Sequence, residues 1–320
     1  MFNLENKENI LKYKIFIICT LTGLFLPLLT LVSCNSEPEK TEEVKLNANT
    51  FTPNPGLRKP DNPPPNPDNP GGGAAGNSSR AANQQDEAEK QVIVDKLKAS
   101  IIVLGIKSNI DIHDSTTWDE DKQGYALKAS YQLFGVIQYT NAQKQQKLYN
   151  LQDDESKTAR REMYLGLDYN SKFIKPFGAL ANKMIAAKNV QMKTDLENMV
   201  DKIRKYAKAY YLTAYNTLIK KQDKLMELGL SALQTLKAKF DEINLADTKI
   251  FYGFTDSIYN DYKNDIEIGT AFPKKNQLQS TATPEEIQNY LNGKFTSVTS
   301  DLNKGIDTAT DIADILNKIQ

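Results

Sequence analysis

Apolar residues recur at helical spacing through the C-terminal region, and this repeat constrains the fold more than any other feature of the chain. Thr283 suits the N-cap of a helix, Pro284 its first position and Glu286 the reciprocal side chain of a capping box. The apolar series that follows has a mean step of about 3.56 residues, which is the period of a helix and not of a strand. Its members are Ile287, Leu291, Phe295, Val298, Leu302, Ile306, Ala309, Ile312, Leu316 and Ile319. Because Gly293, Gly305 and other weak helix formers occupy exposed positions, we expect packing to hold this helix, on its own domain or on another copy.

The same spacing recurs from about Gln84 onward. A second long helix is expected from Val190 to Leu228, because Met192, Leu196, Met199, Ile203, Tyr206, Tyr210 and Ala214 project onto one face. Further helices are expected at 86–107, 120–149, 154–169, 171–189, 230–244 and 247–268, with loops near 108–119, 150–153 and 270–283. The β-branched run IIVLG (101–105) continues the first of these helices, which Gly105 should close. We therefore predict an all-α fold, a bundle of six to eight helices that forms one domain over 84–320.

The first 33 residues have the charge-then-apolar order of a secretory signal. Three lysines precede an apolar or neutral run from Ile15 to Val32, which ends in LVSC, a sequence that resembles a bacterial lipobox. Cleavage is then expected between Ser33 and Cys34, with Cys34 as the acylated N-terminus of the mature chain. The alternatives are an uncleaved membrane anchor and a buried core helix, although Pro27 interrupts the run.

The cysteine content agrees with this interpretation. Only two cysteines occur in the chain, and Cys19 lies inside the expected signal. The mature chain would keep one thiol, at Cys34, and that thiol would be acylated. A disulfide scaffold and a thiol enzyme are therefore excluded, and the acyl chains would hold the protein at a membrane surface.

Residues 34–83 are expected to form a disordered tether. Nine of the 13 prolines fall between Pro38 and Pro70, and a glycine-rich run follows them. Such a composition buries too little apolar surface to fold, and its proline-rich part favours extended polyproline II. The tether would lift the helical domain away from the lipid headgroups, although the proline run is also a conceivable ligand for a proline-recognising domain.

The sequence offers little catalytic chemistry. His113 is the single histidine, so a multi-histidine metal site is impossible, and a serine triad through His113 lacks a GxSxG elbow. The run DEDKQG (119–124) imitates the start of a calcium loop, but Ser130 stands where the twelfth position requires glutamate. Motifs for binding nucleotides are absent from the sequence. We therefore expect no catalytic residues, no metal and no cofactor.

Charge balance argues against a nucleic-acid partner, because 40 basic residues face 40 acidic ones and DNA binding needs a basic excess. One local stripe stands out on the helix expected at 190–228. Arg204, Lys208, Tyr211 and Tyr215 line up at an angle to its apolar face, and tyrosine and arginine dominate protein interfaces. The stripe is either a partner-binding surface or a face that packs beneath a neighbouring helix.

The chain resembles a Borrelia surface lipoprotein family in three features. These are the LVSC motif, the low-complexity tether, and a sequence of predicted helices that includes LKASIIVLGIKSNIDIHDSTTWDEDKQGYALKASYQLFGVI. This paralogous family includes complement regulator-acquiring surface protein 1. The resemblance implies a helical protein of the outer surface, and it covers nearly the whole mature chain. Members meet host proteins in different ways, by capturing the complement regulator factor H, by binding plasminogen or by blocking terminal complement.

The factor H-binding member of that family forms a dimer through its long C-terminal helix. The resemblance therefore implies a possible homodimer through the matching residues here, which are Ile287, Leu291, Phe295, Val298, Leu302 and Ile306.

The expected function is that of a lipid-anchored, non-catalytic outer-surface protein that binds host proteins. A periplasm-facing structural or assembly lipoprotein without a host ligand is the alternative. The long tether favours the host-facing protein, because an inward-facing one needs less distance from its membrane.

Overall fold

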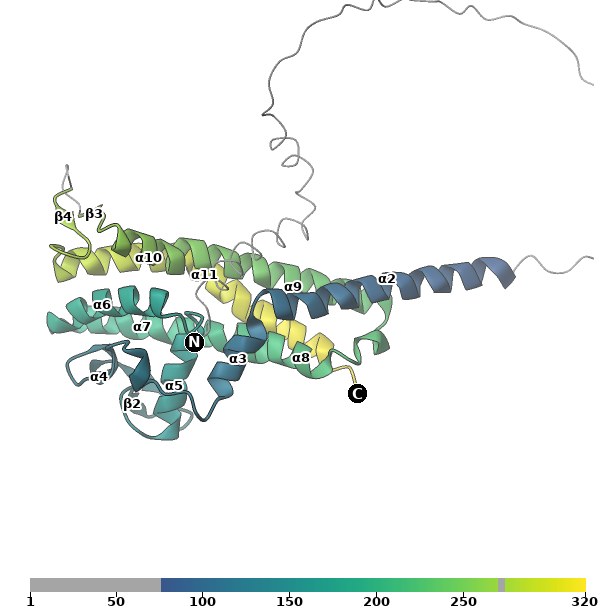
Figure 1. Cartoon of the computed structure of the whole chain (residues 1–320), viewed down its shortest axis with the longest axis horizontal. Coiled ribbons are helices and arrows are strands. Elements are labelled where there is room, and N and C mark those ends of the chain that lie inside the picture. Colours follow the sequence, from purple (N-terminus) through teal and green to yellow (C-terminus); the bar gives the residue numbers. More distant parts are fainter. Residues whose placement is uncertain (1–75, 270–273) are drawn as a thin grey trace, which may run out of the picture.

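A long C-terminal helix, α11 (Pro284–Leu316), runs along the bundle and contacts most of the other long helices. It appears in yellow in Figure 1, which draws the computed structural model; the structure describes residues 76–269 and 274–320. The predicted capping box is confirmed, since the Thr283 side chain accepts from the Glu286 backbone and the Glu286 side chain accepts from the Thr283 backbone. The predicted apolar face is confirmed as well, with Ile287, Leu291 and Leu302 among its buried residues.

Two further long helices pack beside α11. The first consists of α7 (Val190–Ala207), a π-helical segment η2 (Lys208–Tyr215) and α8 (Asn216–Lys221), and a 3-10 turn η3 (Leu225–Glu227) follows it. The second consists of α9 (Leu230–Ile250), a π-helical segment η4 (Phe251–Thr255) and α10 (Asp256–Lys263). Two separate helices were expected at 230–244 and 247–268, but the chain continues through η4 without a break.

The N-terminal part of the bundle contains α2 (Gly76–Val103) and α3 (Ile106–Asp114). Gly105 adopts the left-handed conformation at a φ of 66° and ends the first helix, as predicted. The loop expected at 108–119 was wrong in its first half, because α3 begins directly after that glycine. Helix α2 packs on α9, and its N-terminal end projects beyond the other helices (Figure 1).

Helices α5 (Asp154–Leu165) and α6 (Ser171–Ala186) complete the bundle. The side chains of Asp153 and Asn170 accept backbone N–H groups at their N-termini, and Asn189 does the same for α7. These caps explain why the predicted helix starts near 154, 171 and 190 were correct.

The helix expected at 120–149 was wrong. The segment instead contains a 3-10 turn η1 (Asp121–Gln123), a short helix α4 (Leu133–Val136) and an antiparallel hairpin of β1 (Gln138–Thr140) and β2 (Gln146–Leu148). The hairpin register pairs Gln138 with Leu148 and Thr140 with Gln146.

The physical reason lies in the backbone of that segment. Ala126 has a positive φ of 56°, so the chain reverses where a helix would continue. At Gly135 a Cβ would lie 2.2 Å from the carbonyl oxygen of Ala129, so only glycine allows α4 to pack this closely. Tertiary packing therefore overrides the local helical preference.

A second, two-residue ladder joins β3 (Glu267–Ile268) to β4 (Asn276–Gln277) ahead of α11. In the described ranges there are eight continuous α-helical segments, counting each long helix with its π-helical insert once. The all-α prediction is confirmed. Helix α2 begins at Gly76, whereas the expected domain began at 84, and the expected signal, Cys34 and most of the tether lie outside the described residues.

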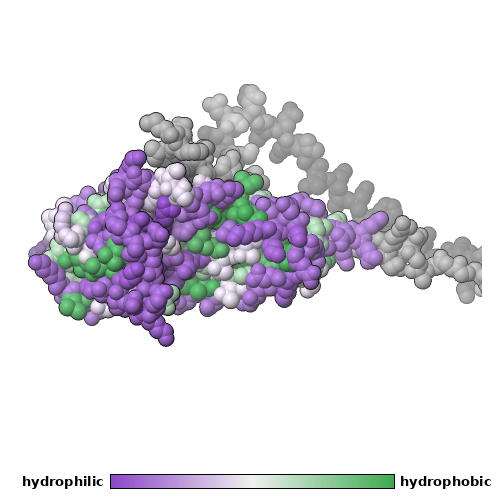
Figure 2. Space-filling view, turned by 90° about the horizontal axis from the view of Figure 1, so that it is seen from below, coloured by the Kyte–Doolittle hydropathy of each residue, from purple (hydrophilic) through white to green (hydrophobic). Residues whose placement is uncertain are grey.

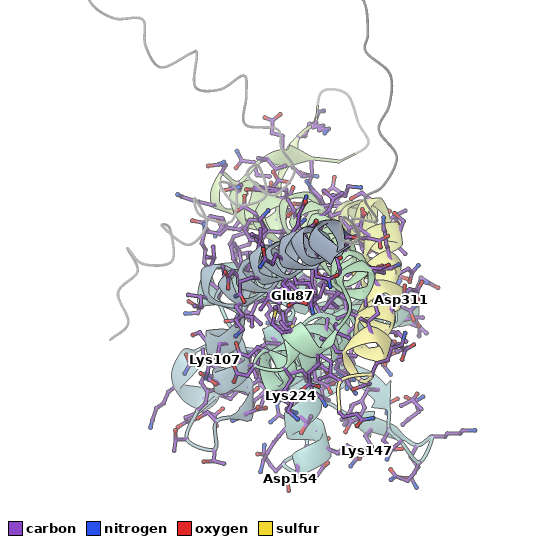
Figure 3. All side chains as sticks on the ribbon, turned by 90° about the vertical axis from the view of Figure 1, so that its right-hand side faces the viewer. Glu87, Lys107, Lys147, Asp154, Lys224 and Asp311 are labelled. Carbon is purple, nitrogen blue, oxygen red and sulfur yellow. The ribbon has the colours of Figure 1, made fainter. Side chains whose placement is uncertain are left out.

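The surface of the bundle is mainly polar. Figure 2 shows one face, on which hydrophilic residues surround smaller apolar areas. Figure 3 shows charged side chains, Lys107, Lys147 and Asp154 among them, projecting from the outside of the bundle. Of the helices in the described ranges, none has the length and apolar character needed to cross a membrane.

Candidate partner-binding site

The tyrosines of the predicted stripe lie inside the bundle. Tyr211 is 3% exposed and Tyr215 is fully buried. The Tyr211 hydroxyl donates to Asp168, and the Tyr215 hydroxyl donates to Asn244 on α9 at 2.7 Å. Because η2 packs against α11 and α3, and Tyr215 also reaches α9, these rings belong to the core and offer no surface to a partner.

Arg204 also points inward, toward α5. Its guanidinium bonds the Glu162 carboxylate at 2.6 Å and the Tyr149 hydroxyl at 2.9 Å, and it lies 5.0 Å from the ring centroid of Tyr139. Only Lys208 keeps an exposed charge, and it too faces Glu162, at 3.4 Å. The stripe therefore matches the second interpretation, a face that packs beneath neighbouring elements.

The apolar face of α11 is likewise covered by its own chain. Ile287 and Leu291 are fully buried, Val298 and Leu302 are each 2% exposed, and Phe295 and Ile306 pack against the same core. The expected dimer residues thus contact α9, η2 and α7 of the same molecule. A second copy would have to open the bundle to reach the four buried residues, so only the partly buried Phe295 and Ile306 of the implied dimer contact are open to it.

His113 stands at the end of α3 and joins three elements. Its Nδ1 lies 3.1 Å from the Tyr169 hydroxyl, and its carbonyl accepts a hydrogen bond from Arg161 at 2.7 Å. Burial lowers the pKa of His113, while the nearby Asp114 carboxylate opposes this shift. In the part of the chain that the structure describes, no three His, Cys, Asp or Glu side chains are grouped so that they would hold a metal ion.

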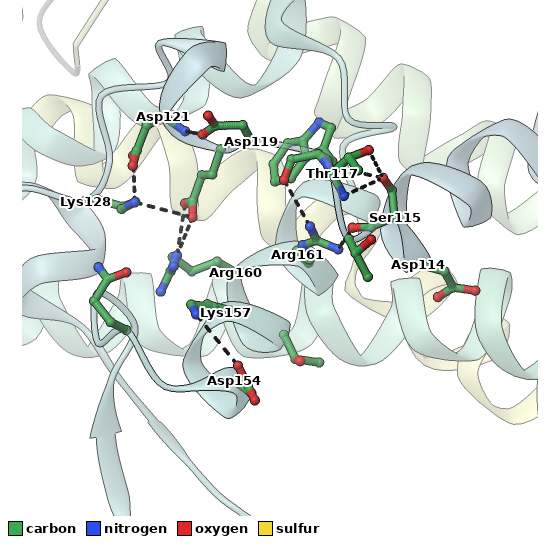
Figure 4. Close-up of a pocket in the computed structure, with 15 residues that line it drawn as sticks. Asp114, Ser115, Thr117, Asp119, Asp121, Lys128, Asp154, Lys157, Arg160 and Arg161 are labelled. Carbon is green, nitrogen blue, oxygen red and sulfur yellow. Dashed lines mark hydrogen bonds and ion pairs between the residues drawn. The ribbon is translucent and has the colours of Figure 1, made fainter.

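A polar cleft of about 690 Å³ lies between the segment 114–121 and α5 (Figure 4). Sequence reasoning missed it, because it treated 120–149 as a helix. The pair Arg160-Arg161 on α5 and the single tryptophan in a polar loop are the signals that point to it. Charged and polar side chains form most of its lining, including Asp114, Asp119, Asp121, Lys128, Lys157 and Arg161.

Arg160 fixes one wall of this cleft. Although it is only 1% exposed, its Nε donates to both carboxylate oxygens of Glu120, at 2.9 and 3.0 Å. Its Nη1 donates to the carbonyl oxygens of Tyr149 and Leu151. A buried charge is tolerated when it is paired and fully hydrogen-bonded, so this arginine ties the 120 region and the end of the hairpin to α5.

Arg161 and Trp118 lie at the other end of the cleft. Arg161 donates to the carbonyl oxygens of His113 and Ser115 at 2.7 Å each, and to that of Trp118 at 3.2 Å. Its guanidinium carbon is 5.2 Å from the centroid of the Trp118 ring, which in turn packs edge-on against Tyr169. An arginine stacked on an aromatic ring beside a cleft is a typical anchor of protein interfaces.

The carboxylates at the rim are held by local donors. Asp121 lies 2.6 Å from Lys128, and Asp154 lies 3.7 Å from Lys157. The backbone N–H of Asp121 lowers the pKa of Asp119, and Lys122 adds to this effect. The rim of the cleft therefore carries acidic side chains next to basic ones.

The chain matches a protein family and several solved structures. A family described as Borrelia Bbcrasp-1 domain containing protein matches residues 117–317. The Lyme disease associated outer surface protein BBA65 from Borrelia burgdorferi has a similar structure, with a TM-score of 0.51 and 17% identity over 69% of this chain and 99% of that chain. The outer surface protein BBA66 from Borrelia burgdorferi gives a TM-score of 0.49 and 11% identity over 72% of this chain and 100% of that chain. A comparison with curated proteins gives no match. The likeness to BBA65 shows a shared fold.

Proposed function

Since the chain belongs to the family of Borrelia Bbcrasp-1 domain containing proteins, we propose that it is a lipid-anchored outer-surface protein that binds host proteins and catalyses no reaction. The observation that carries this proposal is the family match over residues 117–317, which includes most of the cleft lining, the buried tyrosines and α11. A similar structure belongs to BBA65, which is described as an outer surface protein of Borrelia burgdorferi, and this supports a place on the cell surface.

Anchoring is proposed at Cys34. The support is the lysine-then-apolar order of residues 1–33 and the LVSC motif, which together favour cleavage after Ser33 and acylation of the cysteine. Acyl chains contribute about 0.8 kcal/mol per buried methylene, so several chains on one cysteine would anchor the protein stably.

The proposed partners are host serum proteins, of the complement system or of the plasminogen type, and no nucleic acid. A surface protein of this kind needs an exposed site with arginine or aromatic anchors and a charged rim. In the described ranges the cleft beside Arg161 and Trp118 has that composition, whereas the stripe of Arg204 and Tyr215 does not reach the surface.

Two experiments test this function. The first treats intact cells with protease, which should degrade an outward-facing protein and spare a periplasm-facing one. In the same cells Cys34→Ala should move the protein from the detergent phase to the aqueous phase. Equal recovery of variant and wild type in detergent would refute anchoring through Cys34.

The second experiment immobilises residues 35–320 and captures proteins from host serum. The control is an unrelated protein domain on the same support. We expect residues 35–320 to retain a serum protein that the control does not retain. Protection of the protein on intact cells together with no captured serum protein would favour the periplasmic alternative.

A further inference from the structure

Arg161 differs from the other cations of the cleft in having only neutral partners. Each of the other cations forms an ion pair with a carboxylate. Lys128 pairs with Glu120 and Asp121, Lys157 pairs with Asp154, and Arg160 pairs with Glu120. Arg161 bonds three backbone carbonyls and stacks on Trp118, and within the described ranges no carboxylate lies at ion-pair distance from it. Its position is therefore fixed, and its charge is not paired with a carboxylate of the described ranges.

Carboxylates surround this cation at the edges of the cleft. Figure 4 places Asp114 on one side of Arg161, and Asp119, Asp121 and Asp154 on the other side. The Asp154 side chain is fully exposed, and its lysine partner lies at the long distance of 3.7 Å. An incoming group thus meets positive charge in the middle of the cleft and negative charge at both ends.

We propose that this cleft receives an extended segment of a partner protein in which one acidic residue is flanked by basic residues. The acidic side chain would bond Arg161, whose planar guanidinium suits a carboxylate, and the basic side chains would face Asp114 and Asp154. This inference rests on the proposed function, and it names the site and the kind of partner surface. A uniformly acidic segment would be repelled at the rim, and a uniformly basic one would be repelled at the centre.

Trp118 gives this proposal a direct readout, because it is the single tryptophan of the chain and lines the cleft. The test titrates residues 35–320 with the peptide acetyl-Lys-Gly-Glu-Gly-Lys-amide at low salt and follows tryptophan emission. The matched control is acetyl-Glu-Gly-Lys-Gly-Glu-amide, which has the same length and the inverted charge order. We expect a saturable change with the first peptide, weakened by added salt, and none with the second.

Variants locate the effect. The double variant Asp114→Asn with Asp154→Asn should weaken the affinity for the first peptide roughly three- to tenfold, because exposed charge pairs contribute modestly to binding. Lys107→Gln, on α3 outside the cleft lining, should leave binding unchanged. Arg161→Gln should abolish the response, and circular dichroism would establish that its helices persist. The rim variants leave the Arg161 contacts in place, so they test the site even where Arg161→Gln loosens the loop.

Three results would overturn the inference. Equal responses to both peptides would show that the order of charges in the peptide does not determine binding. No response to either peptide would refute the site. An identical saturable response to sodium sulfate at matched ionic strength would make the cleft a simple anion site. If the protein still captures a serum protein when any of these results is obtained, the cleft inference fails while the proposed function is retained. Failure of the inference can therefore be distinguished from failure of the proposed function.

Discussion

Removing the Arg204 side chain should destabilise the domain without touching the cleft. The guanidinium bonds Glu162 through Nε at 3.0 Å and Nη2 at 2.6 Å, and the Glu162 side chain is only 5% exposed. Arg204→Ala would leave that carboxylate buried, and it would also remove the bond to the Tyr149 hydroxyl.

The magnitude follows from what remains near Glu162. Loss of one partner of a buried ion pair costs about 3 to 5 kcal/mol. Lys208 lies 3.4 Å from the same carboxylate and is 57% exposed, so it can move toward Glu162 and offset part of this cost. We therefore expect a loss of about 3 kcal/mol, which in a domain of this size lowers Tm by roughly 6 to 12 °C.

The assay is urea and thermal unfolding of residues 35–320, with Lys208→Ala as the matched control. The control removes the exposed cation from the same carboxylate and should cost less than about 1 kcal/mol. A loss below about 1 kcal/mol for Arg204→Ala would refute the reasoning, and so would equal losses for the two variants. Binding of the peptide with the central glutamate should be unchanged in both variants at temperatures where they are folded.

Three further predictions concern the core and the lone histidine. Tyr215→Ala should lower the free energy of unfolding by about 3 to 5 kcal/mol in denaturant titrations, because the ring is fully buried. Thermal melting should separate two alanine substitutions on α11. Gly305→Ala places a Cβ 2.6 Å from the Tyr206 ring and should destabilise by about 1 to 3 kcal/mol, whereas Gly293→Ala meets open space and should stabilise by up to about 1 kcal/mol. Because burial lowers the pKa of His113, the unfolded chain binds its proton at a higher pH than the folded chain, and stability should fall as the pH drops through about 6.5. Comparing wild type with His113→Asn between pH 7 and pH 5 isolates this contribution, and curves of equal slope would contradict it.

The long helices could be predicted from sequence because several independent signals agree there. At α11 the capping box, the proline at the first position and the 3.6-residue period all indicate the same start and the same buried face. The capping residues Asp153 and Asn189 likewise stand where α5 and α7 begin. Local chemistry is sufficient at these points because the side chain satisfies backbone groups of its own helix.

The cleft could not be predicted, since long-range contacts build it. Arg160 joins Glu120 across 40 positions of the chain, and Arg161 joins His113 across 48. Neither contact leaves a periodic pattern in the sequence. The segment 120–149 also has enough helix-forming residues to resemble a helix. The burial of the stripe that contains Arg204 could not be predicted for a related reason. The projection of a single helix does not show which of its faces a neighbouring helix will cover.

The π-helical segments η2 and η4 have a consequence for how this family can change length. A π-helical hydrogen bond spans one residue more than an α-helical one, so a π-helical segment can absorb a single-residue insertion within a continuous helix. Deleting one residue from η2 would restore α-helical geometry there and keep the residues after it on their present faces. Leu218, which is fully buried in α8, would then stay in the core, whereas a deletion of one residue within α7 would rotate it by about 100°. Relatives that share this core should therefore tolerate a gap of one position inside 208–215 more readily than a gap of one position inside α7.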